Sequence, residues 1–144
     1  MRINGEWFFC DDGIERPIAR GEVLASDGSW VETHFLLDTG ADRTVFSATI
    51  LTALNYQAEV KDFALAGLGG KTNSVIIKTQ IVFPTITGGR ATFRGEFAAV
   101  TDYEALDFSV LGRDITGLLA VIVDQPNRVV SLLRQPHHYK IVQG

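Results

Sequence analysis

The sequence predicts a mostly-β domain, folded as a closed barrel or a sandwich, with one or two short helices. Short runs rich in β-branched and aromatic residues recur along the chain, for example at 72–83 and 91–100, and glycine-containing turns separate them. One segment, residues 48–55, has the apolar spacing of a helix. Because no repeat and no linker composition divides the 144 residues, we expect a single domain.

The composition is that of an ordered globular chain, with 46% hydrophobic and 21% charged residues. The net charge is -4, from 13 basic and 17 acidic residues, and no basic stripe suggests nucleic acid. Cys10 is the single cysteine, which excludes an intrachain disulfide and fits a reducing compartment. The N-terminus lacks the apolar segment of a signal peptide, and the longest apolar run, 118–123, is too short to span a bilayer. We therefore expect a cytoplasmic protein that binds neither membrane nor nucleic acid.

The expected elements follow one another along the whole chain. An N-terminal arm, residues 1–15, packs on the domain, pairs with a partner chain or covers a site. Strand patterns, bounded by glycine, proline and aspartate turns, cover residues 7–10, 17–25, 30–37, 60–66, 72–83, 91–100, 120–123 and 128–133. A C-terminal tail, residues 134–144, is expected to be peripheral.

Turn and cap residues justify the boundaries of these elements. The dipeptide at 27–28 is Asp-Gly, which favours a tight hairpin between the strands on either side. Ser47 is a good N-cap for a helix over 48–55. Residues 67–70 form the glycine-rich tip of a long hairpin, and residues 115–118 predict a second short helix.

Asp38 is the leading candidate for a functional side chain. It ends the apolar run 35–37 and precedes Thr39 and Gly40, and we expect Gly40 to give the backbone the freedom to turn there. A carboxylate at the mouth of an apolar core is costly unless it has a partner or a task. The bare tripeptide is also typical of an ordinary acidic turn, so the motifs further along the chain decide between the two interpretations.

Three motifs in this chain resemble those of the retropepsins, the retroviral-type aspartic proteases. Residues 36–42 are similar to the catalytic loop of that family, 64–70 to its flap, and 110–114 to its apolar-apolar-glycine element followed by a short helix. The resemblance covers residues 16–133 and is closer to cellular and bacterial single-domain members than to virus-encoded enzymes. It implies an all-β, retropepsin-like acid protease barrel with one or two short helices, and no cofactor or metal.

The resemblance also implies an aspartic endopeptidase whose active site is shared by a homodimer. The chain has one Asp-Thr-Gly sequence, so each subunit supplies one Asp38. Two carboxylates in close contact share a proton. One then acts as a base on a water molecule, while the other polarises the scissile carbonyl of a protein or peptide substrate.

Further roles carry over from the family position by position. Thr39 links the two catalytic loops across the dimer axis, and Gly40 lets the substrate backbone approach. Asp42 forms an ion pair with Arg113 near the mouth of the core, and Arg16 reaches the same aspartate of the other subunit. Substrate contacts are expected from Ala41, Asp42, Gly67, Leu68, Gly69 and Gly70, and a supporting role from Gly112.

This sequence departs from the family pattern at several positions. Arg43 stands where retroviral enzymes often carry a second acid, and we expect it to pair with Asp114. Ala41 has no hydroxyl to offer the carboxylates, where pepsin-like enzymes often carry serine, so we expect a mildly acidic to near-neutral pH optimum. The C-terminal hairpin 120–133 and the arm 1–15 are additions that leave the mode of dimerisation open.

Other interpretations carry less support from the residues. Residues 69–72 mimic the end of a P-loop, but Leu65 stands where that motif needs a glycine. The histidine pair at 137–138 has no third ligand at metal spacing, and His34 and Cys10 are expected to be structural. The second functional hypothesis is a retropepsin-fold module that dimerises or binds peptides with little hydrolysis. A β-barrel ligand carrier would leave the Asp-Thr-Gly sequence unexplained.

Overall fold

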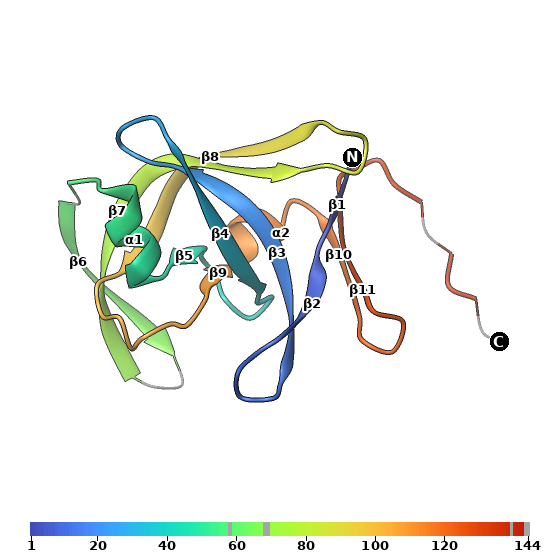
Figure 1. Ribbon diagram of the computed structural model, residues 1–144, viewed down its shortest axis with the longest axis horizontal. Helices are drawn as coiled ribbons and strands as arrows, with labels where there is room; N and C mark the ends of the chain where they lie inside the picture. The colour runs from blue at the N-terminus through green and yellow to red at the C-terminus, as the bar shows by residue number, and fades with distance from the viewer. Residues whose placement is uncertain (58, 68–69, 139, 143–144) are drawn as a thin grey trace.

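The computed structural model describes residues 1–57, 59–67, 70–138 and 140–142, and strands dominate it. The elements are β1 (Arg2–Asn4), β2 (Glu6–Phe9), β3 (Glu15–Leu24), β4 (Trp30–Leu37), β5 (Val45–Phe46), α1 (Ala48–Leu54), β6 (Glu59–Gly67), β7 (Gly70–Pro84), β8 (Arg90–Val100), β9 (Ser109–Leu111), α2 (Arg113–Thr116), β10 (Ala120–Asp124) and β11 (Val129–Leu133). The predicted all-β class with two short helices is confirmed (Figure 1). No helix in the described parts of the chain is long and apolar enough to cross a membrane.

The main sheet closes into a barrel. Its strands run in the order β2-β3-β4-β9-β5-β8-β7-β6, and an additional pairing between β3 and β7 joins Val23 to Ile81. Gly21 makes this approach possible, because a β-carbon there would lie 2.8 Å from the Phe83 ring and 3.0 Å from the Val82 carbonyl oxygen. The structure therefore selects the barrel over the sandwich.

Aromatic rings fill the centre of the barrel. Phe35 of β4 contacts Phe46 and Phe83, with ring centroids 6.2 and 5.6 Å apart, and Phe46 also contacts Phe97 at 5.8 Å. All four rings are buried. A smaller apolar cluster, which includes Val45 of β5, lies beneath the loop that follows β4. Burial of these side chains holds β4, β5 and β8 in register around the loop that carries Asp38.

The Ser47 cap and the hairpin turn behave as the sequence predicts. The Ser47 hydroxyl accepts the backbone N–H of Ile50 at 3.4 Å. Asn55, predicted as the last helical residue, instead follows α1 in the left-handed conformation at φ 54° and ends it. Gly28 has φ +85° in the hairpin between β3 and β4. The second helix begins at Arg113, two residues before the expected start, because the Gly112 carbonyl already accepts backbone N–H groups of the first turn.

The N-terminal arm packs on the domain. β1 pairs with β11, which pairs with β10, and the three strands form a second sheet, whereas β2 pairs with β3 of the barrel. The chain crosses between the two sheets at Gly5, where a β-carbon would lie 2.4 Å from the Ile18 carbonyl oxygen. Figure 1 shows the N-terminus and the strands β10 and β11 together at one end of the molecule, with the C-terminal tail beyond them.

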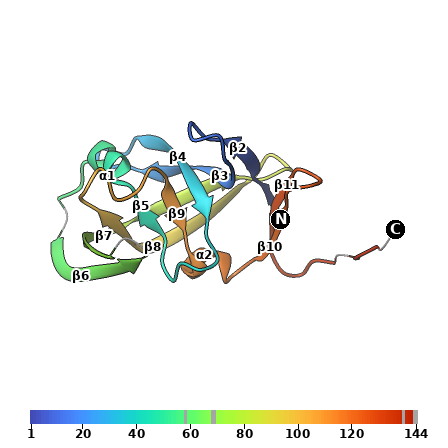
Figure 2. The ribbon, with the colours of Figure 1, turned by 90° about the horizontal axis from the view of Figure 1, so that it is seen from below.

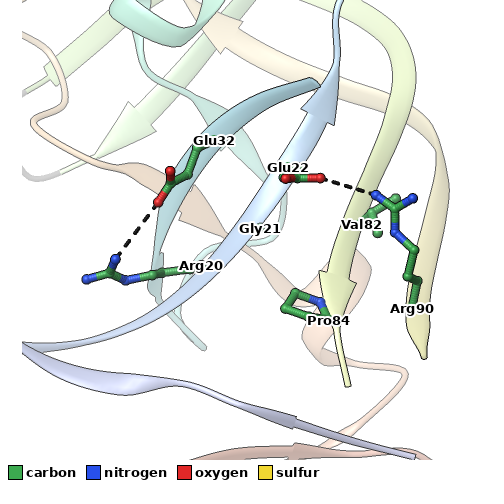
Figure 3. Close-up of a pocket in the computed structure, with 7 residues that line it drawn as sticks. All are labelled: Arg20, Gly21, Glu22, Glu32, Val82, Pro84 and Arg90. Atoms are coloured by element: carbon green, nitrogen blue, oxygen red, sulfur yellow. Dashed lines mark hydrogen bonds and ion pairs between the residues drawn. The ribbon is translucent and has the colours of Figure 1, made fainter. Parts of the chain in front are cut away.

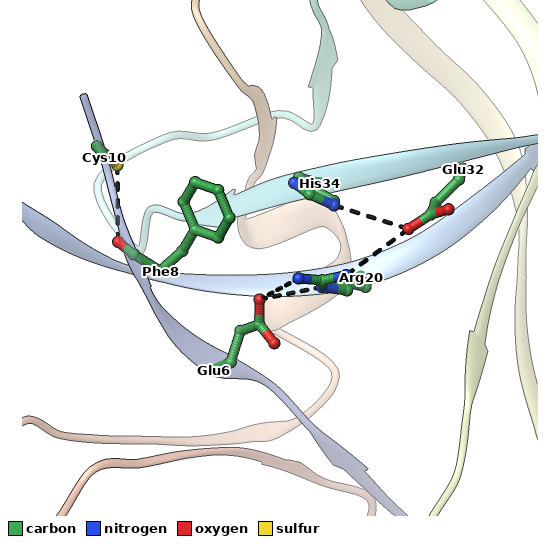
Figure 4. Close-up of polar contacts among 6 residues, drawn as sticks. All are labelled: Glu6, Phe8, Cys10, Arg20, Glu32 and His34. Carbon is green, nitrogen blue, oxygen red and sulfur yellow. Dashed lines mark hydrogen bonds and ion pairs between the residues drawn. The ribbon is translucent and has the colours of Figure 1, made fainter.

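Polar contacts tie the arm to the outer face of the barrel (Figure 4). The Arg20 guanidinium donates to the Glu6 carboxylate at 2.8 and 3.0 Å and lies 3.9 Å from that of Glu32. His34 lies 3.7 Å from Glu32 and packs edge-on against the Phe8 ring at 5.5 Å, which supports a structural role for this histidine. Cys10, which directly follows β2, is buried, as expected of a small apolar residue.

Candidate active site

The loop that contains Asp38 passes over the end of β9. β4 runs parallel to β9, with Leu37 opposite Leu111, and β5 lies on the other side of β9, with Val45 opposite Val110. The chain must therefore cross the carboxyl end of β9 between residues 38 and 44. This crossing brings the loop against Gly112 and the start of α2.

Backbone hydrogen bonds hold Asp38 at the start of this loop. Its N–H donates to the Leu111 carbonyl at 3.3 Å, and its own carbonyl accepts the N–H of Ala41 at 3.1 Å. The carboxylate oxygen Oδ1 accepts the N–H of Gly40 at 2.9 Å, and the Asp38 side chain is half-buried. The loop thus presents a partly exposed carboxylate whose position the backbone determines.

The expected reason for Gly40 is wrong. Its φ lies outside the left-handed region, so the turn does not require glycine for conformational freedom. Instead, a β-carbon at this position would lie 3.1 Å from Oδ1 of Asp38, which is a tighter contact than side chains ordinarily make. The absence of a side chain lets the Gly40 N–H approach the carboxylate.

Arg113 connects α2 to the loop at three points. Its backbone N–H donates to the Ala41 carbonyl at 2.8 Å, and its Nη1 donates to the Thr39 carbonyl at 3.0 Å. Its Nη2 forms the predicted ion pair with Asp42. The two side chains are 53% and 82% exposed, so the pair lies largely in solvent. The parallel pair of Arg43 with Asp114 stays a prediction.

Thr44 is a positioning residue that the sequence analysis did not identify. Its buried hydroxyl donates to the Asp114 carboxylate at 2.7 Å and accepts the Gly112 N–H at 3.2 Å. Its backbone N–H donates to the same carboxylate at 2.9 and 3.0 Å. The signal available in the sequence for a role of Thr44 was its place between charged residues and the apolar start of β5. The sequence does not show that its partner is Asp114, 70 positions further along the chain.

Gly112 completes the contact between loop and helix. A β-carbon at this position would lie 2.3 Å from the carbonyl carbon and oxygen of Arg43, closer than any atoms can pack without moving. The expected supporting role of Gly112 therefore has a physical cause, since only glycine lets β9 end this close to the backbone of the Asp38 loop.

The β6–β7 hairpin occupies the position predicted for the flap in the sequence. Gly67 of β6 lies opposite Gly70 of β7. Leu68 and Gly69, for which substrate contacts are predicted, lie outside the described residues. β6 pairs with β7 and forms one edge of the main sheet, as Figure 2 shows at the left of the molecule.

Arg16, at the start of β3, has a partner in the N-terminal arm of its own chain. Its guanidinium binds the Asp12 carboxylate at 2.7 and 3.0 Å, and this contact lowers the pKa of Asp12 to about 2. The predicted reach of Arg16 to another subunit stays a prediction, and in that assembly Asp12 would compete for the same guanidinium.

A surface pocket lies apart from the predicted site (Figure 3). Two ion pairs border it, Glu22 with Arg90 at 3.2 Å and Arg20 with Glu32 at 3.9 Å. No residue predicted for the active site lines this pocket. In the described parts of the chain, no group of three histidine, cysteine, aspartate or glutamate residues is placed to bind a metal ion.

Comparison with known proteins agrees with this geometry. A family model described as aspartyl protease matches residues 23–121, which include the Asp38 loop, the β6–β7 hairpin and α2. No curated protein matches the chain.

Among the solved structures that are similar to the chain are two proteases. A retropepsin-like aspartic protease from Rickettsia conorii has a TM-score of 0.59 at 16% identity, and the match covers 92% of this chain and 90% of that one. The EIAV protease complexed with the inhibitor HBY-793 has a TM-score of 0.49 at 23% identity, over 71% of this chain and 86% of that one. The extent of the family match, together with a barrel like that of the Rickettsia protein, shows that this chain belongs to the aspartyl protease family and has a retropepsin-like fold.

Proposed function

We propose that this chain is an aspartic endopeptidase whose active site contains Asp38 from each of two subunits. The observation that carries the proposal is the half-buried Asp38 carboxylate, held by the Gly40 N–H at the end of β4. Hydrogen bonds from the loop to Leu111 and Arg113 hold the backbone around it. A carboxylate whose position is determined in this way is suited to act on a substrate.

The proposed mechanism needs two carboxylates because one acts as a base and the other as an acid. In a dimer, the two Asp38 side chains share one proton, since two adjacent negative charges repel each other. The ionised carboxylate takes a proton from water, whose oxygen forms a bond to the carbonyl carbon of the substrate. The protonated carboxyl gives its proton to the carbonyl oxygen. The carboxyl that took up the proton from water then passes it to the nitrogen, and the C–N bond breaks with its electron pair leaving on nitrogen. A hydroxyl proton of the intermediate returns to the other carboxylate, so the pair again holds one proton.

The proposed substrate is a protein or peptide bound as an extended strand. Main-chain hydrogen bonds to the β6–β7 hairpin and to the Asp38 loop would hold it, and apolar pockets would select its side chains. Gly40 is exposed and has no side chain, so it offers room for the substrate backbone beside the carboxylate. Thr39 is exposed in the same loop, and its proposed contact is with the second subunit.

Substitution of the carboxylate tests this proposal. Asp38→Asn should reduce hydrolysis of a mixed peptide library by at least about a hundredfold, because an amide cannot take up the proton from water. Asp11→Asn, which changes an exposed aspartate in the turn after β2, is the matched control and should remain active. Circular dichroism of each variant reports whether the fold is retained. Undiminished hydrolysis by folded Asp38→Asn protein would contradict the proposal.

A module that dimerises or binds peptides without hydrolysis is the alternative function. The chain contains one Asp-Thr-Gly sequence, so a subunit alone supplies one of the two carboxylates that the proposed mechanism needs. Wild-type protein that dimerises and binds peptides, yet cleaves none from acidic to neutral pH, would support this alternative.

A further inference from the structure

We propose that two copies of this chain associate through the exposed edge of β10, which would pair antiparallel with β10 of the second copy. The result would be a continuous six-stranded sheet in the order β1-β11-β10-β10-β11-β1, built from the three-stranded sheet of each chain. This inference rests on the proposed function, since it names the surface that brings two Asp38 loops together.

The outer edge of β10 is open. β10 pairs with β11 from Ala120 opposite Leu133 to Asp124 opposite Val129, and it pairs with no other strand in the described parts of the chain. Because alternate residues of a strand direct their backbone groups to opposite sides, part of its N–H and C=O groups points away from β11. Such a row of groups readily accepts a further strand.

The residues of β10 do not protect this edge. Residues 120–123 are alanine, valine, isoleucine and valine, without the lysine, proline or bulge that commonly blocks edge strands. Val123 is 45% exposed, and Leu118, just before the strand, is 63% exposed. An apolar, unprotected edge is costly in water unless another surface covers it.

The opposite edge of the same sheet is contacted within the chain. On the outer side of β1 the Arg2 carbonyl accepts the N–H of Ile86 at 3.1 Å, whereas the Met1 carbonyl accepts that of Arg134 at 3.2 Å and so extends the pairing with β11. β1 itself is held against β11. The terminal strand is thus used inside its own subunit, so the proposed dimer needs no exchange of chain ends.

The position of β10 suits a second copy better than an unrelated strand. β10 begins four residues after α2, whose Arg113 holds the Asp38 loop. In Figure 2 the loop after β4, α2 and the start of β10 gather at the lower edge of the molecule. A two-fold axis between antiparallel β10 strands is perpendicular to the sheet, so each subunit would present its Asp38 loop on the same side. A second copy of this chain would therefore both complete the proposed site and cover the open edge of β10.

The strand is also complementary to itself. An antiparallel pairing centred on Ile122 places it opposite Ile122 of the partner subunit, and Val121 opposite Val123 of the partner subunit. Asp124 then faces Ala120 of the partner subunit, so no two carboxylates oppose each other. The Asp124 carboxylate is bound by Asn127 within its own turn, at 3.2 Å to the backbone N–H and 2.8 Å to Nδ2.

Sedimentation equilibrium of edge variants tests the surface. Val123→Lys should raise the dimer dissociation constant at least tenfold, because a charge at this edge must be desolvated on pairing. Phe9→Lys is the matched control: it introduces the same charge at a 67% exposed position of β2, the edge strand of the other sheet. It should leave the dissociation constant unchanged. Circular dichroism confirms folding of both variants.

Cysteine cross-linking tests the geometry without weakening the contact. Ile122→Cys should form a disulfide-linked dimer on mild oxidation, whereas Ile86→Cys, at a 56% exposed position in the turn after β7, should not. The native Cys10 is buried and does not compete. The linked dimer should keep its specific activity at dilutions where the wild-type protein loses it.

The outcomes separate this inference from the proposed function. A wild-type protein that is monomeric at every concentration, a Val123→Lys protein that dimerises normally, or a dimer dissociated by Phe9→Lys would overturn the β10 pairing. Because sedimentation and cross-linking do not require hydrolysis, a dimer linked at β10 that cleaves no peptide would support the surface while contradicting only the endopeptidase proposal.

Discussion

Arg113 is the residue that most directly connects the Asp38 loop to the rest of the barrel. It contacts Ala41 through its backbone N–H, and Thr39 and Asp42 through its guanidinium. Arginine suits this position because its planar group can donate to two oxygens at once. The ion pair itself is well exposed, so solvent screens its charges. The position of the loop therefore depends more on the hydrogen bonds to backbone carbonyls than on the attraction between charges.

A double-mutant cycle separates these two contributions. Asp42→Ala should lower the free energy of unfolding by at most about 1 kcal/mol, the usual range for an exposed pair, and the coupling energy with Arg113→Ala should be of that size. Arg113→Ala should cost more than Asp42→Ala, because it also removes the donor to Thr39. Urea denaturation of the four proteins measures both quantities. A larger cost for Asp42→Ala than for Arg113→Ala would contradict this account.

Ala41 lies in the loop that Asp38 begins. Its side chain is partly buried and packs against the small apolar cluster that includes Val45, while its backbone contacts both Asp38 and Arg113. Serine at this position would add a hydroxyl to the loop that carries the carboxylate without adding much volume.

Ala41→Ser should shift the pH–rate profile toward acid. A hydroxyl that donates to a carboxylate favours the ionised form, so both limbs of the bell-shaped curve should move to lower pH. The measurement is peptide hydrolysis by wild type and variant across one set of buffers, with Ala48→Ser in the buried first turn of α1 as a control for the added hydroxyl. A profile that is unchanged, or that moves toward alkali, would show that residue 41 does not set the titration of the site.

The β6–β7 hairpin has fewer neighbouring strands near its tip than it has further along β7. β7 pairs with β8 from Ser74 to Pro84, but nearer its start it pairs with β6 alone, from Ala64 opposite Asn73 to Gly67 opposite Gly70. A two-stranded ribbon without a third strand is marginally stable. We therefore expect this part of the hairpin to rearrange at low cost if, as proposed, a substrate strand adds to it.

Hydrogen exchange tests this role of the hairpin. Backbone amides of residues 60–75 should exchange more slowly when an inhibitor that mimics an extended peptide is bound, because the bound strand supplies new hydrogen bonds. The hairpin between β3 and β4 lies elsewhere on the barrel and should exchange at the same rate with and without inhibitor. Equal exchange in residues 60–75 in the two states would count against the flap.

The whole molecule carries one Asp-Thr-Gly sequence on one closed barrel. The second, smaller sheet joins both ends of the chain on the side where α2 leads into β10. Each subunit thus has a closed barrel of its own but only one of the two carboxylates that the proposed chemistry needs. Activity should therefore depend on protein concentration.

Dilution measures this dependence. The specific activity of the wild-type protein should fall as its concentration passes below the dimer dissociation constant obtained independently by sedimentation. Inhibitor binding should restore the dimer at the same concentration, because an inhibitor in the proposed shared site would contact both subunits. Full specific activity in a species shown to be monomeric would contradict the shared site.

Much of the architecture was predictable from residues close together in the sequence. Ser47 caps α1, Asn55 ends it, and Gly28 turns the hairpin, since each of these effects depends on neighbours within a few positions. The contact between Asp42 and Arg113 was also predicted, although by resemblance rather than by local pattern. Local patterning missed the start of α2 and the reason for Gly40, because both depend on hydrogen bonds that exist only once the loop has formed.

The amino-acid sequence by itself thus determined the longer strands, the Ser47 cap and the identity of the candidate carboxylate, but it did not predict β1 or β5. Only the tertiary structure decided that β9 lies between β4 and β5, that β3 and β7 close the barrel, and that Thr44 binds Asp114 across 70 positions. It also decided that β1 pairs with β11 inside one subunit and that β10 has no second neighbouring strand among the residues that the structure describes. The physical reason is that strand order and hydrogen-bond partners depend on how apolar faces pack across the whole barrel, whereas turns and caps depend on backbone conformations that a few neighbouring residues select.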